Sequence, residues 1–474
     1  MNSLIMDNVD KLIKQWFCDN EKKVTDISDR IWSIAETKFQ EVESSETLIN
    51  EFEKEGFKIA KGVAEIETAF TAEWANGQGP VIAMIGEYDA LPNMGHKIST
   101  TKEPTSGSGH GCGHNLLGVG SMAAAIASKK VMEKLDIKGR IKYFGCPAEE
   151  GGAAKVFMVR DNVFDGIDAI VRWHPVNVSY VSLSPALSMY SVKYVFHGKT
   201  SHAGTNPHLG RSALDAAVLM DVGVNYLREH VTPDVRMHSI ITKGGVAPNI
   251  VPELAEIWYY IRAPKRAEVE SIYSRMNKIA EGMAMATETT VDIRLISASS
   301  DTLPNKVLSE RALINLNKVG PPKFTEEDKV FAEKLSKGIT VADKVKSLIP
   351  YGISDSKVAE KTLHDEISSN MTEGIISPYS TDSGDVSWQA PMCQFFIAAQ
   401  PIGTANHSWQ QVVSSGMSIG HKGMLCAGQA IAMMALDILT DSDLLERAKK
   451  EYNEQLNLYP YTCPLPKNIK PGQE

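Results

Sequence analysis

The sequence predicts an α/β protein with a mostly parallel sheet, helices on both faces of that sheet, and a small inserted α+β domain. The first observation behind this prediction is an alternation of strand-like and helical segments. Apolar runs of buried-strand length stand at 81–85, 141–145 and 169–173, and helical patterns at 116–135 and 152–163 lie between them. Such alternation is typical of parallel strands whose crossover helices cover the sheet.

The second observation is a change of pattern near residue 188. Strands and helices then follow in the order β-α-β-β-α-β, which predicts a ferredoxin-like domain at 188–304. The flanking ranges, 1–187 and 305–474, form the two parts of the larger domain. A length of 474 residues agrees with two domains, because it exceeds what one hydrophobic core usually holds. Within the larger domain, 7–56 has helical spacing and 320–375 is a charged helical excursion.

The bulk composition is that of a globular protein and argues against two classes of partner. Apolar residues make up 43% of the chain, charged residues 23%, and the net charge is -9. This acidic balance lacks the basic footprint of nucleic-acid or membrane-surface binding, so we expect neither partner. We also expect no signal peptide and no stretch approaching the roughly 18–20 apolar residues of a membrane span. The six cysteines have no framework spacing, which favours a reduced, cytoplasmic protein.

Two clusters of chemistry-bearing residues dominate the sequence. One is the glycine-rich stretch 109–115 with Cys112 and His114, and the other is the pair Glu149 and Glu150 after an apolar strand. Thiolate, imidazole and carboxylate are ligands of zinc-like divalent metals. In an extended loop, residues two apart point the same way, so Cys112 and His114 can reach one metal. The clusters therefore predict a metal-dependent hydrolase in which one acid of the pair binds metal and the other is a base.

Three predicted strands end on polar residues, which strengthens the metal-site interpretation. The first leads into Glu87 and Asp89, the second into Glu149 and Glu150, and the third into His174. Because the carboxyl ends of strands form the sites of open α/β sheets, we expect these groups to meet.

Three other histidines have more than one interpretation. His110 is as well explained by a structural role as by metal binding. His407 lies in a polar loop at 403–409, and His202 lies in the inserted domain, where it could stabilise an oxyanion. A competing serine-hydrolase interpretation rests on the G-x-S-x-G pattern at 416–420, but that order needs a later histidine and none follows His421.

Several motifs resemble one family, the dinuclear metallo-aminoacylases and carboxypeptidases that hydrolyse N-acyl amino acids, and in particular its amidohydrolase branch. The resemblance spans nearly the whole chain and is carried by residues 86–91, 109–118, 207–215, 381–388, 421–425 and 463–468. It implies a catalytic domain with an inserted lid and dimerisation domain. It also implies cleavage of the amide bond of an N-acyl amino acid, with p-aminobenzoyl-glutamate as the expected substrate.

The resemblance also implies roles for individual residues. Two divalent ions, zinc or manganese, would be held by Cys112, His114, Glu150, His174 and His407. Glu149 would be the general base, Asp89 would orient the site, and His202 would reach the active site of a dimer partner. This chain departs from many relatives at Glu87, where they carry His or Asp, so we do not expect Glu87 to bind metal.

A substrate carboxylate needs a cation, because the acidic chain does not attract anions at long range. Arg262, on a predicted strand at 258–262, and Asn249, in a glycine- and proline-rich stretch, are the candidates in the inserted domain. The expected partner is a second copy or a related subunit, bound through that domain. Two alternatives stay open: another substrate, such as an indole-acetyl-amino acid or a β-alanyl dipeptide, and a non-catalytic subunit that keeps the fold.

Overall fold

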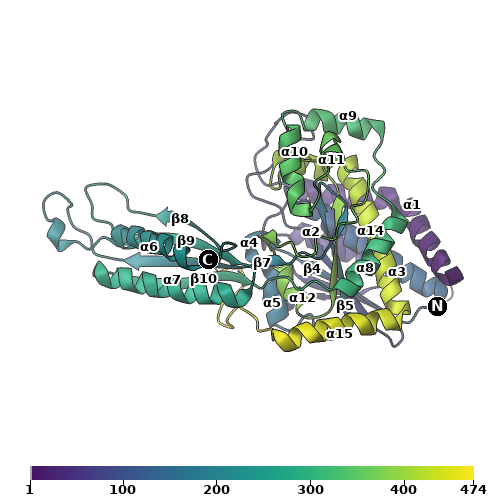
Figure 1. Ribbon diagram of the computed structural model, residues 1–474, viewed down its shortest axis with the longest axis horizontal. Coiled ribbons are helices and arrows are strands. Elements are labelled where there is room, and N and C mark those ends of the chain that lie inside the picture. Colours follow the sequence, from purple (N-terminus) through teal and green to yellow (C-terminus); the bar gives the residue numbers. More distant parts are fainter. Residues whose placement is uncertain (1–2, 474) are drawn as a thin grey trace. The chain divides into compact units, whose positions relative to one another are not determined.

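A computed structural model describes residues 3–473 and divides the chain into two compact units (Figure 1). Unit 1 comprises Met1–Ser184, Leu303–Ser377 and Val386–Thr462, and unit 2 comprises Pro185–Thr302, Pro378–Asp385 and Cys463–Glu474. The last two segments of unit 2 differ from the expectation that 305–474 returns wholly to the larger domain. Long-range pairing explains the first of them, because β11 (Ser377–Ser380) pairs with a strand of unit 2 and Asp385 accepts a hydrogen bond from the Ser300 amide at 2.8 Å.

Unit 1 is built on a seven-stranded sheet in the order β1-β2-β4-β3-β5-β12-β6. Its strands are β1 (Lys58–Lys61), β2 (Phe70–Asn76), β3 (Val81–Glu87), β4 (Gly139–Cys146), β5 (Ala169–Val176), β6 (Tyr180–Ser182) and β12 (Met392–Ala398). The neighbours β4, β3, β5 and β12 pair in parallel, and the pairs at both edges are antiparallel. The three strands predicted from the apolar runs are therefore confirmed as adjacent parallel strands.

Six helices contribute buried apolar side chains to the core of unit 1, and several of them pack against the sheet. They are α1 (Ser3–Ile34), α2 (Val42–Lys54), α3 (His114–Leu135), α8 (Lys306–Val319), α14 (Ser418–Thr440) and α15 (Ser442–Leu458). Helix α3 contacts β3 and packs against α1 and α14, and α14 contacts β5 and β12. Most residues of α3 and α14 are buried, as expected of helices that are apolar on nearly all sides.

Helix α14 differs from the expectation that no stretch approaches membrane-spanning length. It is long and apolar enough to pass that test by length and composition, but 78% of its most apolar window is buried inside the protein. Burial against α3 and the sheet accounts for its apolar character.

The predicted helical stretch at 7–56 is interrupted by a turn at 35–41, which we call the N-terminal turn. Ala35 and Phe39 have left-handed backbone conformations, with φ of 49° and 61°, that a continuous helix cannot contain. The turn pairs with the segment after β3, because the Ala90 amide donates to the Glu36 carbonyl at 2.7 Å. The interruption therefore brings the N-terminal turn to the carboxyl edge of the sheet.

Unit 2 has the ferredoxin-like arrangement that the sequence predicts. Its elements are β7 (Ala186–His197), α6 (Ala213–Leu227), β8 (Arg236–Lys243), β9 (Leu254–Ala263), α7 (Arg266–Ala286) and β10 (Thr290–Ser299). The strands form an antiparallel sheet in the order β10-β7-β9-β8, so β8 is an edge strand. Helices α6 and α7 pack on each other and on the strands.

Shorter helices complete the fold. They are α4 (Glu149–Gly152), α5 (Ala154–Arg160), α9 (Glu326–Leu335), α10 (Val341–Leu348), α11 (Ser356–Glu360), α12 (Ser383–Ser387) and α13 (Trp409–Ser415). Helices α9, α10 and α11 occupy the charged excursion expected at 320–375.

Candidate metal centre

The carboxyl ends of the four parallel strands supply the candidate site. Strand β3 leads to Asp89, β4 to Glu149 and Glu150, β5 carries His174 near its end, and β12 precedes the loop of His407. Because these strands are parallel neighbours, the loops that follow them meet at one edge of the sheet.

A glycine sets the course of the loop that carries the thiol. Gly113 adopts a left-handed conformation with φ of 76°, and a Cβ there would lie 2.8 Å from Cγ of Pro175. Only glycine combines that φ with such a close approach at low cost. Helix α3 begins directly afterwards, so Cys112 lies just before the helix and His114 in its first turn.

Six side chains gather at this edge, and we call them the donor cluster: Cys112, His114, Glu149, Glu150, His174 and His407. They fall into three groups whose ligand atoms lie within 4.8 Å of one another. The first group is Cys112, His114 and His174; the second is Cys112, Glu150 and His407; the third is His114, Glu149 and Glu150. Cys112, His114 and Glu150 each belong to two groups, which is the pattern expected where two ions share a site.

Hydrogen bonds orient the imidazoles of the cluster toward a common centre. Nδ1 of His174 lies 2.9 Å from the Pro175 carbonyl, and its Nε2 lies 3.5 Å from Sγ of Cys112. Nδ1 of His114 lies 2.8 Å from Oδ1 of Asp89, while its Nε2 is buried, makes no hydrogen bond and lies 3.3 Å from Oε2 of Glu87. Metal-binding histidines have this arrangement, with one ring nitrogen held by an oxygen and the other left for the ion. The donor set and the orientation of the rings fit a divalent metal such as zinc.

Asp89 joins two parts of the donor cluster through one carboxylate. Its Oδ1 is bound to the ring of His114, and its Oδ2 accepts a hydrogen bond from the amide of Glu150 at 2.8 Å. Asp89 is buried, so both contacts are shielded from water. This residue thus fixes the His114 ring relative to the backbone of the acidic pair.

Burial and neighbouring charges set the protonation of the cluster. Hydrogen bonds to Cys112 and Glu150 raise the pKa of His407 to about 10, and Nε2 of His407 lies 3.0 Å from Oε1 of Glu150. Burial alone would lower the pKa of His114, but Cys112 and Asp89 raise it well above its usual value. Burial raises the pKa of the Cys112 thiol. A divalent cation would therefore compete with protons for these atoms.

Glu87 belongs to a separate ion-pair network beside the cluster. Its Oε1 lies 2.9 Å from Nζ of Lys155 and 3.6 Å from a guanidinium nitrogen of Arg172, and all three side chains are buried. Its other oxygen lies 3.3 Å from Nε2 of His114. Burial alone would raise the pKa of Glu87, but Lys155 and Arg172 hold it well below its usual value. Glu87 is therefore a charge partner of these cations and lies outside the three donor groups.

His110 also lies outside the three donor groups. It is buried, and its Nε2 lies 3.1 Å from the Ile31 carbonyl of α1. Burial lowers the pKa of His110 to about 3, so the ring is neutral at physiological pH. Of the two interpretations left open by the sequence, the contact favours the structural one.

Glu41 is the main site residue that sequence reasoning missed. It lies in the N-terminal turn, its carboxyl group is fully buried, and it accepts a hydrogen bond from the amide of Ala148 at 2.9 Å, directly before the acidic pair. Burial, reinforced by the charge of Asp89, raises the pKa of Glu41 to about 8. No spacing in the sequence separates Glu41 from the surface acids around it, because its role depends on a contact with a distant segment.

The three candidates in the inserted domain lie in unit 2. The exposed side chain of His202 accepts hydrogen bonds through Nδ1 from the amides of Gly204 and Thr205, at 3.2 and 3.0 Å. The loops of His202 and Asn249 are neighbours, because the amide of the residue after His202 donates to the Asn249 carbonyl at 3.0 Å.

Arg262 lies on β9 of unit 2 with a partly buried guanidinium group. Its Nε is buried without a hydrogen-bond partner, and the ring of Tyr260 lies 5.7 Å away. Among the residues that the structure describes, no acidic side chain forms an ion pair with Arg262. A guanidinium in this state can still accept a carboxylate ligand.

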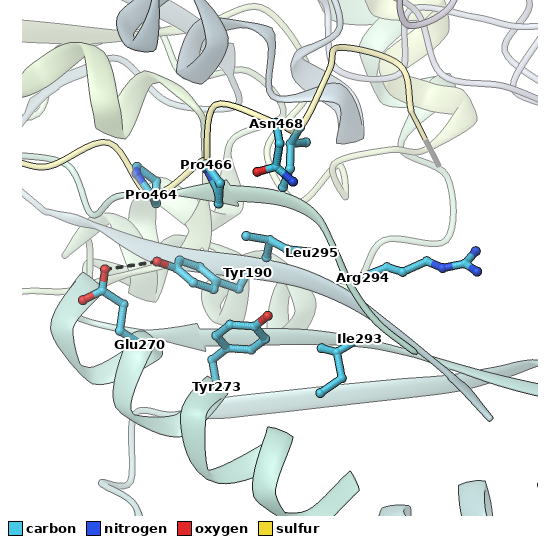
Figure 2. Close-up of a pocket in the computed structure, with 10 residues that line it drawn as sticks. Tyr190, Glu270, Tyr273, Ile293, Arg294, Leu295, Pro464, Pro466 and Asn468 are labelled. Atoms are coloured by element: carbon cyan, nitrogen blue, oxygen red, sulfur yellow. Dashed lines mark hydrogen bonds between the residues drawn. The ribbon is translucent and has the colours of Figure 1, made fainter. Parts of the chain in front are cut away.

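A separate cavity of about 540 Å³ lies within unit 2 (Figure 2). Tyr190 and Tyr273 face it, the hydroxyl of Tyr190 is hydrogen-bonded to Glu270 at 3.2 Å, and Pro464 and Pro466 of the C-terminal segment run along its other side. None of the predicted site residues lines this cavity.

The chain matches one protein-family model and is similar in sequence to several known hydrolases. A model described as a peptidase dimerisation domain matches residues 187–288. The chain is 41% identical over 466 residues to one of the subunits of the p-aminobenzoyl-glutamate hydrolase of Escherichia coli (strain K12), and the alignment covers 96% of each chain. It is 31% identical over 448 residues to the Xaa-Arg dipeptidase of Mus musculus, with 91% of this chain and 89% of the relative covered.

Among solved structures, a dinuclear metal-binding peptidase of the M20 family from Bacillus subtilis has the same fold. Its TM-score is 0.55 at 18% identity, and the alignment covers 89% of this chain and 98% of the other.

Proposed function

Because the chain belongs to the M20 family of metal-dependent peptidases and amidohydrolases, we propose that it hydrolyses the amide bond of p-aminobenzoyl-glutamate. The products would be p-aminobenzoate and glutamate. The observation that carries this proposal is the 41% identity, over 96% of both chains, to a p-aminobenzoyl-glutamate hydrolase subunit. The complete donor cluster supports a catalytic role for this chain, since a purely structural subunit would not need it.

Two divalent ions, zinc or manganese, would be held by Cys112, His114, Glu150, His174 and His407. Ions at this position would supply Lewis-acid activation of water and of the amide carbonyl. A thiolate and three imidazoles favour zinc, whereas a carboxylate also suits manganese.

Glu149 is the proposed general base. It lies in the donor group with His114 and Glu150. The amides of Ala148 and Glu150, on either side of it, donate hydrogen bonds to the side chains of Glu41 and Asp89. Its carboxylate would take a proton from the attacking water and deliver it to the leaving amine. The amide nitrogen then leaves as a neutral amine.

Residues of unit 2 are proposed to bind the rest of the substrate. Arg262 offers a guanidinium without an ion-pair partner in the described chain, which suits the free carboxylates of a glutamate. Asn249 and His202 lie on neighbouring loops, where an amide and an imidazole could bind the substrate and stabilise the oxyanion.

Unit 2 is also the proposed site of association with a second copy or a related subunit. Apolar side chains are exposed on α6, namely Val218, Val222 and Tyr226, and on the edge strand β8, namely Ile240. An unpaired edge strand beside exposed apolar side chains is typical of an interface. We also propose a cytoplasmic location, which stays a prediction.

A second substrate class follows from one comparison. The 31% identity to an Xaa-Arg dipeptidase favours dipeptides as an alternative. Indole-acetyl-amino acids and β-alanyl dipeptides stay open for the same chemical reason, since all present an amide next to a free carboxylate.

A substrate panel tests the proposal. The zinc- or manganese-loaded protein is assayed with p-aminobenzoyl-glutamate, an Xaa-Arg dipeptide, indole-acetyl-aspartate and β-alanyl-lysine, and kcat/KM is compared. We expect p-aminobenzoyl-glutamate to have the highest value. A higher kcat/KM for another member of the panel would reassign the substrate, and no turnover of any of them by metal-loaded protein would favour a non-catalytic subunit.

A further inference from the structure

We propose that Glu41 is a positioning residue that holds the backbone before Glu149 and Glu150, and so sets the direction of both acids within the donor cluster. The inference rests on the proposed function for its meaning in catalysis. We call residues 147–153 the acidic turn.

The carboxyl group of Glu41 connects the N-terminal turn to the acidic turn. Its Oε1 accepts hydrogen bonds from the amides of Phe39, at 3.0 Å, and Ala148, at 2.9 Å. Its Oε2 accepts a hydrogen bond from the hydroxyl of Thr68 at 3.1 Å. One buried side chain therefore links three segments that are far apart in the sequence.

The backbone that Glu41 holds has an unusual conformation. Ala148 is left-handed with φ of 54° and ψ of 36°, and Ala153 at the other end of the turn is left-handed with φ of 53°. Residues with a Cβ adopt this conformation rarely, and it persists where surrounding contacts impose it. The hydrogen bond from the Ala148 amide to Glu41 is such a contact, and it lies one residue before Glu149.

A packing contact joins the same two turns independently. A Cβ at Gly152 would lie 2.8 Å from the ring of Phe39 and 2.6 Å from Cβ of Ala148. The ring of Phe39 thus covers the acidic turn, while Glu41 holds both the Phe39 amide and the Ala148 amide. The N-terminal turn therefore contacts the acidic turn near its beginning, through Glu41 and Ala148, and near its end, through Phe39 and Gly152.

Two acidic side chains therefore hold the backbone on either side of Glu149. Glu41 binds the amide of Ala148, and Asp89 binds the amide of Glu150. The residue between them is Glu149, the proposed base. Fixing the amides on either side restricts the backbone from which its side chain projects.

The surroundings of Glu41 favour a specific role over general stabilisation. In the described part of the chain, no lysine or arginine forms an ion pair with Glu41, although its side chain is fully buried. Burying a carboxyl group without a cation is costly, so its hydrogen bonds must offset that cost. Burial also raises the pKa of Glu41 to about 8, so the group is largely neutral at physiological pH and glutamine should mimic it.

Two variants of Glu41 and one of Gly152 test the inference. Glu41→Gln keeps a carbonyl oxygen for the Phe39 and Ala148 amides. Glu41→Asp withdraws the carboxyl group by one methylene. Gly152→Ala disturbs the same turn from the other side, which keeps the test decisive if the aspartate variant does not fold.

A matched control lies on the following helix. Glu51 of α2 is also a buried glutamate, but it pairs with Lys23 and Lys54 and not with the acidic turn. Glu51→Gln therefore removes a buried carboxylate without touching the proposed contact.

The first readout is the affinity for Zn²⁺, measured by competition with a chromophoric chelator, with kcat and KM as the second. We expect Glu41→Asp and Gly152→Ala to weaken Zn²⁺ binding by about 10–100-fold, as is typical for residues that orient metal ligands. Their kcat should fall with little change in KM. Glu41→Gln and Glu51→Gln should bind Zn²⁺ with nearly the affinity of the unmodified chain.

Two outcomes would overturn the inference. Unchanged Zn²⁺ affinity in both Glu41→Asp and Gly152→Ala would show that the turn does not need this support. An equal loss of affinity in Glu51→Gln would show a general effect of destabilisation. Because Zn²⁺ affinity is measured without substrate, a failure of the proposed function, seen as no turnover by the metal-loaded unmodified chain, is distinguishable from either outcome.

Discussion

Asp89 orients two candidate metal ligands but is not itself a member of the donor groups. Its two oxygens bind the ring of His114 and the amide of Glu150, both at 2.8 Å. The contact with Nδ1 of His114 leaves Nε2 available to an ion, and the contact with Glu150 places a carboxylate in the same group. The orientation of two candidate ligands thus depends on a single buried acid.

Replacing Asp89 with asparagine should weaken metal binding. An amide has only one oxygen acceptor, and its NH₂ group would face either the His114 ring or the Glu150 amide. We expect Asp89→Asn to lower Zn²⁺ affinity by about 10–100-fold, measured by chelator competition. Asp136→Asn, at an exposed acid bound to Lys138, serves as the control and should leave the affinity unchanged. Equal affinity in the two variants would refute the orienting role.

At the scale of elements, the pairing of β3 and β4 beneath the site depends on a glycine. A Cβ at Gly86 would overlap the phenol of Tyr143, whose hydroxyl donates to the Gly118 carbonyl of α3 at 3.2 Å. Gly86 is paired with Gly145 of β4, and the next residue along β3 is Glu87. The packing of Tyr143 across β3 therefore requires a residue without a Cβ at position 86.

Gly86→Ala should destabilise the fold by roughly 1–3 kcal/mol, because the rigid, buried Tyr143 cannot easily move away. Gly282→Ala on α7 is the matched control, since a Cβ there meets open space. Replacing that helical glycine should stabilise the protein by about 0.5–1 kcal/mol. Urea denaturation of both variants measures the free energies of unfolding, and a shift of the same sign in both would contradict the packing argument.

The elements that the sequence could predict are those whose signals are local. The apolar runs of β3, β4 and β5 and the polar residues after them are visible within short segments of the chain. The same holds for the strand and helix order of unit 2. Once parallel pairing is assumed, the meeting of Asp89 after β3 with Glu150 after β4 follows from topology.

The features that the sequence could not predict depend on contacts between distant segments. Helical spacing continues on both sides of the N-terminal turn, and its left-handed residues, Ala35 and Phe39, are not the glycines that usually mark such a break. Missing the turn meant missing Glu41, whose partner Ala148 is 107 residues away. Assignment of 378–385 and of the C-terminal segment to unit 2 likewise depends on long-range contacts.

At the scale of the whole molecule, the donor cluster and the proposed association surface belong to different units. The donor cluster lies in unit 1, whereas the exposed apolar residues of α6 and β8 lie in unit 2. Tyr226 is the most prominent of these, with 74% of its surface exposed. Exposed apolar groups of this kind are stabilised when a partner covers them.

A charge on that surface should weaken association. We expect the unmodified chain to sediment as a dimer and the double variant Val222→Glu and Tyr226→Glu to sediment as a monomer at the same concentration, because two buried carboxylates would oppose the interface. Ile314→Glu changes an exposed apolar residue of α8 in unit 1 and should leave the dimer intact. A double variant that still sediments as a dimer would place the interface elsewhere.

Release of glutamate from p-aminobenzoyl-glutamate by the metal-free chain, before and after Zn²⁺ or Mn²⁺ is restored, tests directly whether the donor cluster is a hydrolytic metal centre. The Glu149→Gln variant is measured beside it. We expect no turnover without metal, turnover with about two equivalents of metal per chain, and a loss of about 10²–10⁴-fold in kcat in the variant. A chain that binds no metal, or a Glu149→Gln variant as active as the unmodified chain, would contradict the assignment of the donor cluster as a hydrolytic metal centre.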